Sequence, residues 1–439
     1  GRDCAPFSRS RGPHAHDEPG NGIDEDCDGA DTPEGAALPS APTFWGELPA
    51  DRVRRYDVVW FVIDALRADH TGAGGYSKPT TPYLDDLAKE SWFFTHALSQ
   101  SSATMLSFPS MLTGVDPGKL EWRLDRGRLQ LAPGQPFLSE RFGSLGYTTG
   151  FVAAEYFEKR LPGLLEGWSE VAIQDRNQRK SSSSSAAHAA SFISRARTTD
   201  APFFLMVYLP APHAPYVDHP QGYPKFGNTP AGKYDAEIAN ADRYLGFVLD
   251  VLRSDPARYK RTIIIATGDH GEEFGEHGGS EHANTCHHES VHVPLVVRIP
   301  DEEPQRIDVP VGLIDVTPAL LELVGAPAAP GQRLDGNSLL LAKHAPDRLS
   351  ADRPFFCSVV SQKAAQGDFF RRAVRSGKWA LFKEMRGSQA VTLYDVEKDP
   401  AEQAPVSEGG DADAARTRLD TWLSIQLTGN VGSAPLTGD

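Results

Sequence analysis

Long hydrophobic runs, cysteine and basic side chains are all scarce in this sequence. None of its 439 residues lies in an apolar run of the ~20 residues that a membrane-spanning helix needs, and no signal peptide is apparent. Since the chain begins at Gly1 instead of Met, we expect an upstream segment to have been removed. Lys and Arg total 44 against 59 Asp and Glu, a net charge of −15 that argues against nucleic acid or an anionic membrane as the main partner.

Four cysteines are too few for a disulfide scaffold. Cys4 and Cys27 flank a short acidic segment and could pair with each other in an oxidising compartment. Cys286 and Cys357 fall in regions that we predict to be folded core, and we interpret both as free thiols.

The composition changes twice along the chain. Residues 1–50 are rich in Gly, Pro and Asp and lack apolar periodicity, which predicts an acidic segment followed by a linker. Residues 51–345 alternate apolar runs with helical patterns, and residues 346–439 hold short strand-like runs followed by a tail. The length suits one large α/β domain with smaller parts attached.

The acidic segment contains a candidate cation loop. Oxygen-bearing side chains recur with glycines between them, as a short calcium loop requires, at Asn21, Asp24, Asp26, Asp28 and Asp31. The phrase is similar to Asp-rich metal-binding repeats of bacterial surface proteins, and the alternative is a solvated acidic linker. Either interpretation favours an extracytoplasmic location in a bacterium, whether periplasmic, cell-surface or secreted.

Two apolar runs end in aspartate. Tyr56–Ile63 precedes Asp64, and Thr262–Gly268 precedes Asp269 and His270. Continuous apolar runs are typical of buried parallel strands, and open α/β sheets bind ligands at the carboxyl ends of such strands. The alternation with helices, including an amphipathic one over 233–254, predicts a mainly parallel sheet sandwiched by helices.

Other local patterns complete the fold prediction. Thr81 is a plausible N-cap for a helix that starts at Pro82. The run Ser181–Ser185 is interpreted as a flexible surface loop. Short strands over 355–360, 372–375, 378–382 and 390–394 predict a small antiparallel C-terminal α+β subdomain.

The strand-end residues suggest metal chemistry. A divalent cation held by Asp64, Asp269 and His270 could also bind the oxygen of a hydroxyl from the Ser99–Gly114 segment. Binding would lower the pKa of that hydroxyl and turn it into a nucleophile. Cleavage of an ester at phosphorus or sulfur would follow, because the same ion stabilises charge on the transferred group.

Taken together, these motifs resemble the sulfatase family of the alkaline phosphatase superfamily. The resemblance runs in order from about residue 55 to 406 and rests on Asp64, Thr80–Leu84, Thr104–Gly114, Pro212–Tyr216, Gly268–Gly278, His292–Leu295 and Leu393–Gln403. It implies an alkaline-phosphatase-like fold with metal ligands Asp64, Thr104, Asp269 and His270. It also implies that His213 and His282 contact the transferred or leaving group. Nearby competitors for the latter role are His277, His287, His288 and His292.

The sequence departs from that family's pattern at the nucleophile. Typical sulfatases carry a Cys/Ser-x-Pro-x-Arg phrase whose first residue becomes formylglycine, whereas the matching positions here are Thr104, Leu106 and Phe108. Formylglycine is therefore not expected. Ser107 offers a rival register, but spacing to Thr113-Gly114 favours Thr104.

A second departure concerns the metal. Ala65 replaces an aspartate and His270 replaces an asparagine of many sulfatases, which favours zinc or manganese and leaves calcium possible. We expect a hydrolase of anionic esters, phosphate first and sulfate second, that uses Thr104 and a covalent intermediate. The alternatives are a phosphoethanolamine-type transferase, similar over Arg67–Asp69 and Thr104–Pro109, or a catalytically silent surface or binding protein that keeps the fold.

Overall fold

The computed structural model describes residues 55–125, 128–132, 137–174, 182–217, 223–326, 334–360, 370–385, 388 and 390–427. The predicted cation loop of Asn21 to Asp31, the proposed pairing of Cys4 with Cys27 and the acidic segment of residues 1–50 lie outside these ranges. None of the described helices is both long enough and apolar enough to cross a membrane.

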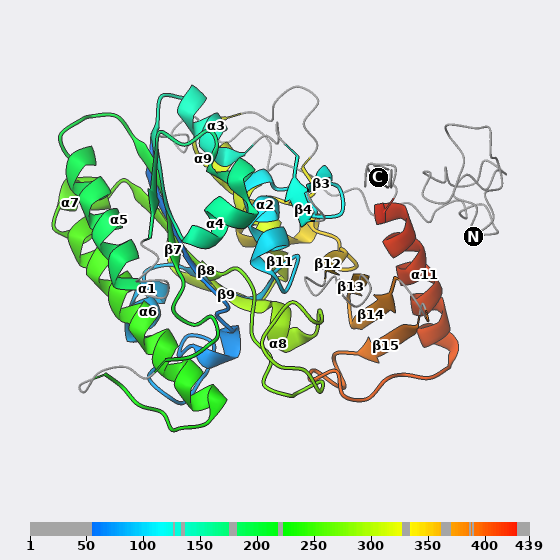
Figure 1. Ribbon diagram of the computed structural model, residues 1–439. Helices are drawn as coiled ribbons and strands as arrows, with labels where there is room; N and C mark the ends of the chain where they lie inside the picture. Colours follow the sequence, from blue (N-terminus) through cyan, green and yellow to red (C-terminus); the bar gives the residue numbers. More distant parts are fainter. Residues whose placement is uncertain are drawn as a thin grey trace.

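A large twisted sheet forms the centre of the described chain (Figure 1). Its strands are ordered β10 (Gln305–Ile307), β2 (Trp92–Leu98), β9 (His292–Arg298), β8 (Thr262–Gly268), β1 (Asp57–Ile63), β7 (Phe203–Leu209), β5 (Thr148–Ala153) and β6 (Glu170–Ile173), while β11 (Val311–Gly312) also pairs with β2. Strand β9 runs antiparallel to β2 and β8, and the other pairs are parallel. The predicted mainly parallel sheet is confirmed.

Helices cover both faces of this sheet (Figure 1). One face packs against α1 (Pro82–Ala88), α5 (Ser182–Ala196) and α6 (Pro230–Arg253), and the other against α2 (Thr104–Thr113), α3 (Leu138–Ser144), α4 (Glu155–Arg160) and α9 (Val316–Leu323). In β1, Trp60 points into one apolar layer and Phe61 into the other. Every residue of that strand is buried, because a strand between two helical layers has no solvent face.

Smaller elements connect the layers. They are a β3–β4 hairpin (Trp122–Asp125 and Arg128–Leu131), α7 (Pro256–Tyr259), α8 (His288–Val291) and α10 (Leu339–His344). Pro82 begins α1 as predicted, but the Thr81 hydroxyl does not cap a helix amide: it accepts from the amide of Gly72 and donates to the carboxylate of Asp85.

The flexible-loop prediction for the serine run was wrong for the part that the structure describes. Ser182 is the first residue of α5, and both Ser182 and Ser185 are fully buried. The Ser185 hydroxyl donates to the carbonyl oxygen of Tyr208 in β7 at 2.7 Å. Serine is small enough for the helix to lie close to the sheet, and its hydroxyl is satisfied there by a backbone acceptor.

A second sheet lies beside the first (Figure 1). It is antiparallel and contains β12 (Phe355–Val360), β13 (Phe370–Ser376), β14 (Trp379–Glu384) and β15 (Val391–Asp395). The four predicted strand regions are confirmed. Helix α11 (Gly410–Leu427), which was not predicted, packs its Leu419 and Leu423 with Val374 and Leu381 of this sheet.

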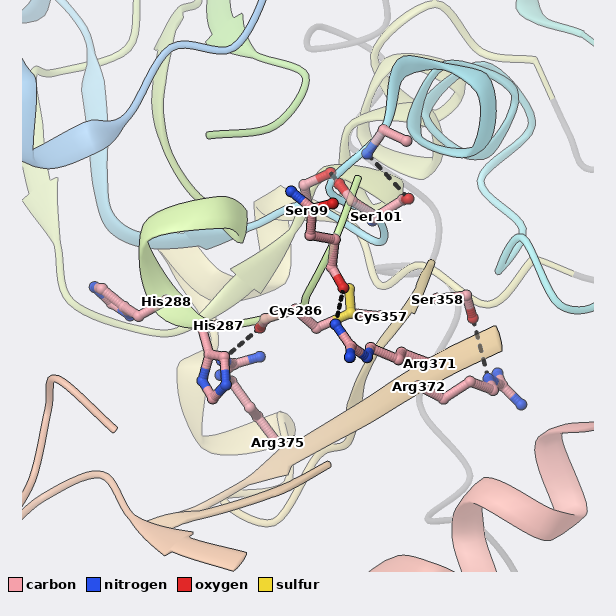
Figure 2. The surroundings of a disulfide bond; sticks show 12 residues. Ser99, Ser101, Cys286, His287, His288, Cys357, Ser358, Arg371, Arg372 and Arg375 are labelled. Carbon is pink, nitrogen blue, oxygen red and sulfur yellow. Dashed lines mark hydrogen bonds between the residues drawn. A yellow bond between two sulfur atoms is a disulfide. The ribbon is translucent and has the colours of Figure 1, made fainter. Parts of the chain in front are cut away.

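A disulfide connects the histidine-rich loop to the C-terminal antiparallel sheet (Figure 2). It links Cys286, in the loop before α8, to Cys357 in β12, with the two Cα atoms 6.0 Å apart. The interpretation of both residues as free thiols was therefore wrong. Their separation of 71 residues gave no local sign of the pairing, which arises only when the C-terminal sheet docks beside the histidine-rich loop.

Candidate active site

The ends of β1 and β8 bring the two predicted aspartates together. The strands are parallel neighbours with Ile63 opposite Gly268, so the next residues, Asp64 and Asp269, leave the sheet side by side. Both carboxylates are buried, with exposed fractions of 2% and 0%. Two buried carboxylates at the ends of neighbouring strands repel each other unless a cation or protons lie between them.

His270 has an orientation that suits a metal ligand. Its Nδ1 lies 2.8 Å from the carbonyl oxygen of Gly271, which can only accept, so Nδ1 carries the proton. The lone pair of Nε2 then faces Asp64 Oδ1 at 3.4 Å and Asp269 Oδ2 at 3.7 Å. A ring N–H donated to a backbone carbonyl is the usual way in which proteins orient a metal-binding histidine.

The same two carboxylate oxygens are buried, and none of the described residues donates a hydrogen bond to them. The other oxygen of each group is satisfied: the Tyr208 hydroxyl donates to Asp64 Oδ2, while the amides of Ala65 and His270 donate to Asp269 Oδ1 at 3.1 and 3.0 Å. Each acid thus presents one bare oxygen to a shared space with the His270 nitrogen, and the ligand atoms lie within 4.8 Å of one another. The residues present fit a divalent cation.

Burial dominates the electrostatics of this cluster. Burial, followed by the nearby Asp269 charge, raises the pKa of Asp64 well above its ordinary value, and burial also raises the pKa of Asp269. Burial lowers the pKa of His270, so the imidazole is neutral and available as a ligand. A bound cation would hold both acids ionised at neutral pH.

Thr104 reaches the same space from the opposite side. It is the first residue of α2, and its Oγ1 lies 3.2 Å from His270 Nε2. Ser107, the rival nucleophile, lies one turn further along α2, and its hydroxyl makes no hydrogen bond within the described chain. The structure therefore brings Thr104 to the three candidate ligands.

Two further histidines approach the cluster. The ring of His282 lies 4.5 Å from that of His270 and 4.5 Å from that of His213, measured between ring centroids. His213 follows β7, and both His213 and His282 are half-buried. The structure thus places Thr104, His213 and His282 around the predicted ligands.

Glu272 controls the protonation of His282. Its Oε1 lies 3.0 Å from His282 Nδ1. Burial alone would lower the pKa of His282, but the hydrogen bond to Glu272 and its charge, with the charges of Asp64 and Asp269, raise it overall. The arrangement suits an imidazolium that donates a proton from Nε2.

The loop that carries His282 is anchored at several points. The Ala283 amide donates to the carbonyl oxygen of Ser102 at 2.8 Å, which ties the loop to the segment before Thr104. Glu273 and Glu281 form a two-way backbone bridge across the loop. Ser99 and Ser101 lie near the disulfide (Figure 2), and the Ser99 hydroxyl donates to the carbonyl oxygen of Asp269 at 2.6 Å.

The competing histidines have other partners. Nitrogen–oxygen distances join His277 to Glu289 at 2.7 Å, His287 to Glu402 at 2.9 Å and His292 to the carbonyl of Thr95 at 2.8 Å. The ring of His288 packs against that of His292. These contacts give the four histidines positions in the loop and the neighbouring sheet rather than at Thr104.

Tyr208 and Glu272 also contact the site, and neither was predicted from the sequence. Glu272 stands two residues after His270, inside the phrase on which the resemblance rests, and that proximity was the available signal. Tyr208 is the penultimate residue of β7 next to β1. Only the pairing of those strands shows that its hydroxyl reaches Asp64.

Comparison with known proteins agrees with this geometry. The family model described as Sulfatase matches residues 56–326, which is more than half of the chain. The chain belongs to the sulfatase family. A second model, described as N-sulphoglucosamine sulphohydrolase, C-terminal, matches residues 275–426 and so includes the antiparallel sheet and α11. The sulfatase family is a family of hydrolases, and its assignment confirms the resemblance inferred from the motifs.

Individual sulfatases share limited sequence identity with this chain. An ulvan-active sulfatase of Formosa agariphila is 22% identical over 86% of this chain and 82% of its own length. Arylsulfatase K of Gallus gallus is 31% identical, but the match covers 40% of this chain and 33% of that protein.

Solved structures share the fold. A crystal structure of Ps i-CgsB in complex with k-i-k-neocarrahexaose superposes with a TM-score of 0.70 at 20% identity, covering 86% of this chain and 94% of that one. The phosphonate monoester hydrolase of Agrobacterium radiobacter gives a TM-score of 0.70 at 19% identity, covering 85% and 96%. The alkaline-phosphatase-like architecture predicted from the sequence is confirmed.

Proposed function

We propose that this sulfatase-family protein is a metal-dependent hydrolase that cleaves an anionic ester through Thr104. The observation that carries the proposal is the position of Thr104 Oγ1, 3.2 Å from His270 Nε2, where one bare oxygen of Asp64 and one of Asp269 also converge. Asp64, Asp269 and His270 would hold the cation. Two carboxylates and one imidazole suit zinc or manganese, and calcium is the third candidate.

A divalent cation bound there would lower the pKa of the Thr104 hydroxyl and neutralise charge on the transferred group. The protein's own residues perform the remaining work. The rigid ends of β1 and β8 fix the ligands, and the first turn of α2 fixes Oγ1 beside them. Backbone amides at the start of α2 also favour an anion near Thr104.

In the first step, ionised Thr104 Oγ1 forms a bond to the phosphorus or sulfur atom while the ester bond to the leaving oxygen breaks. His282, held protonated by Glu272, gives its proton to that leaving oxygen. His213 lies against His282 and would contact the transferred group or share in this proton transfer.

In the second step, water attacks the phosphorus or sulfur atom of the threonine ester. Neutral His282 takes the proton of the attacking water, and the bond to Oγ1 breaks. The products are free phosphate or sulfate, protonated His282 and ionised Thr104 Oγ1, which restores the starting state of both residues. Threonine is not the residue converted to formylglycine, so this pathway needs no modified side chain.

The substrate is proposed as a phosphate or sulfate ester. Both groups are tetrahedral anions that the same cation and histidines would recognise. The broken formylglycine phrase favours phosphate, and the phosphonate monoester hydrolase fold neighbour is compatible with it. The sulfatase relatives, one of them named as ulvan-active, support a sulfate ester on a polysaccharide.

The test uses the full chain, treated with chelator and reloaded separately with zinc, manganese or calcium. Turnover of aryl phosphate, bis-aryl phosphate and aryl sulfate is measured for wild type, Thr104→Ala and Thr104→Ser. Wild type should turn over at least one ester only when loaded with metal. Thr104→Ala should lose roughly 10³-fold or more in kcat, and Thr104→Ser should keep part of the activity.

Thr113→Ala is the matched control, since Thr113 ends the same helix and its hydroxyl contacts only backbone groups, the carbonyls of Pro109 and Ser110 and the amide of Val115. It should retain wild-type turnover. Full activity in Thr104→Ala, or no ester turned over by any metal-loaded wild type, would overturn the proposal. Adding an alcohol or ethanolamine acceptor separates hydrolysis from transfer, because a transferase would form the acceptor ester as its main product.

We also propose that the protein works outside the bacterial cytoplasm. The Cys286–Cys357 disulfide supports this, because such bonds persist in oxidising compartments and are rare in the cytosol. Alkylation of the protein in intact cells, without reductant, should leave both cysteines unmodified. Alkylation of both thiols in the native protein would contradict the location.

A further inference from the structure

A second cluster of acids and histidine lies beyond the candidate active site. It consists of Glu273 and His277, in the loop after β8, and Glu289 in α8. One ligand atom from each lies within 4.8 Å of the others. Glu273 and Glu289 are 2% and 7% exposed, so two carboxylates share a largely dry space.

Glu273 supplies the observation that points to a ligand. Its Oε1 accepts a hydrogen bond from the amide of Gly279 at 3.1 Å, whereas Oε2 is buried and receives no hydrogen bond from the part of the chain that the structure describes. A buried carboxylate oxygen with no donor is costly. The Glu289 charge adds to that cost, and burial together with Glu289 raises the pKa of Glu273.

His277 is oriented toward this space. Its Nε2 lies 2.9 Å from the carbonyl oxygen of Glu402, which only accepts, and 3.1 Å from the side-chain amide of Gln403; the carbonyl is the nearer contact and favours a proton on Nε2. Its Nδ1 lies 2.7 Å from Glu289 Oε1, a hydrogen-bond contact that a bound ion would replace, with release of the Nδ1 proton. The same N–H-to-carbonyl arrangement holds His270 in the candidate active site, where it leaves the opposite nitrogen for a metal.

Other charged groups near the cluster are already paired. Glu402 is bound by Arg375 at 2.7 Å and His287 at 2.9 Å, and Glu276 is bound by Arg67 at 2.6 Å. Among the described residues, His277 is therefore the one basic group that faces Glu273 and Glu289. Even if it is protonated, one negative charge is left without compensation.

We propose that Glu273 Oε2, His277 Nδ1 and Glu289 Oε1 bind a second divalent transition-metal ion, of the zinc or manganese type. Two carboxylates with one imidazole match the ligand preference of these ions better than that of magnesium. Glu273 and His277 also line a cavity of about 630 Å³ between the loop and the C-terminal sheet, which gives an ion access and leaves room for water ligands.

An ion at this place would stabilise the loop that carries His282. Glu273 forms the backbone bridge to Glu281, the residue before His282. His277 connects the same loop to the backbone of Glu402, next to the C-terminal sheet. The second ion would therefore have a positioning role, and its binding can be measured whether or not the proposed hydrolysis is correct.

The test counts metal ions in the full chain. Wild type, Glu273→Gln, Asp64→Asn and the double variant are stripped with chelator, loaded with zinc, freed of excess ion and analysed by elemental mass spectrometry. Each single variant should hold one ion fewer per chain than wild type, and the double variant two fewer. Zinc bound by the N-terminal acidic segment is common to all four proteins and cancels in the difference.

Glu276→Gln is the matched control, since Glu276 lies in the same loop but pairs with Arg67, and it should keep the wild-type count. A wild-type count in folded Glu273→Gln would overturn the proposal. Loss of an ion from Asp64→Asn alone would leave the active-site assignment intact while removing the second site.

A measurement on wild type covers the case in which Glu273→Gln does not fold. Crystals soaked in zinc should show an anomalous peak, present above the zinc edge and absent below it, among Glu273, His277 and Glu289. Ordered crystals with a peak at Asp64 and none at this cluster would overturn the second site.

Discussion

The two clusters have the same ligand types but differ in what supports and surrounds them. Asp64, Asp269 and His270 stand at the ends of parallel strands in the centre of the sheet, facing the Thr104 hydroxyl. Glu273, His277 and Glu289 lie in a loop and a short helix, beside the antiparallel sheet. Ligand chemistry alone makes both clusters suitable for a cation, so the neighbouring hydroxyl distinguishes a site for chemistry from a site for positioning.

The largest expected difference comes from removing one carboxylate at each place. Asp64→Asn should reduce turnover by roughly 10³-fold or more, because it removes a ligand of the ion that activates Thr104. Glu289→Gln should reduce turnover by less than about tenfold, because its effect reaches the chemistry only through the loop. Steady-state kinetics in metal-loaded protein measure both, and equal losses would contradict the distinction.

Thermal stability without metal provides a further test of the Asp64 and Asp269 cluster. In chelator, Asp64→Asn should melt no lower than wild type, because a neutral amide removes the repulsion between Asp64 and Asp269. Thermal unfolding followed by circular dichroism provides the measurement.

His282 connects the two regions, and its replacement should give the next largest effect. His282→Gln should lower kcat by roughly 10²- to 10⁴-fold for an alkyl ester, which needs a proton on the leaving oxygen. The loss should be much smaller for a nitrophenyl ester, whose leaving group departs without one. His287→Gln, in the same loop but paired with Glu402, should show no such dependence on the leaving group.

Removing the disulfide measures how much it stabilises the contact between the C-terminal sheet and the histidine-rich loop. Replacing both Cys286 and Cys357 by alanine should lower the free energy of unfolding by roughly 2–4 kcal/mol, because the bond closes a long loop in the unfolded chain. Denaturant titration of the purified variant measures this change. An unchanged unfolding free energy would show that packing alone keeps the two sheets together.

The last predicted effect is a pH dependence at Glu402, which appears only in acid. Burial by itself would raise the pKa of Glu402, but Arg375 and His287 lower it to about 2. The unfolded value is about 4.3, so the ionised group contributes on the order of 3 kcal/mol above that pH. This contribution is lost as the pH falls through the window from about 4.3 to 2.

Glu402→Gln provides the comparison for that window. The difference in unfolding free energy between wild type and Glu402→Gln should be largest near neutral pH and should shrink below pH 4. A constant difference down to pH 2 would contradict the lowered pKa.

The sequence predicted the parts of this molecule that depend on local pattern. Apolar runs that end in Asp64 and Asp269 located two strands and the sheet edge where their side chains meet, and the structure places Thr104 and His270 there as expected. Their chemical roles remain predictions. The four short C-terminal strands were also visible as apolar runs.

Features that depend on contacts between distant residues were not predicted. Cys286 and Cys357 are 71 residues apart, and only the docking of two sheets pairs them. The serine run was judged by its composition, yet Ser185 is buried because β7 offers it a carbonyl acceptor. Likewise, Tyr208 reaches Asp64 only through the pairing of β7 with β1.

Ala65 has a consequence for how such a site can evolve. It has a φ of +57°, in the left-handed region, while its amide donates to Asp269 and its carbonyl accepts from Tyr234. Aspartate and asparagine tolerate this conformation better than most residues do. Ala65→Asp would therefore fit the existing backbone, so one codon change could bring a further carboxylate to the end of β1.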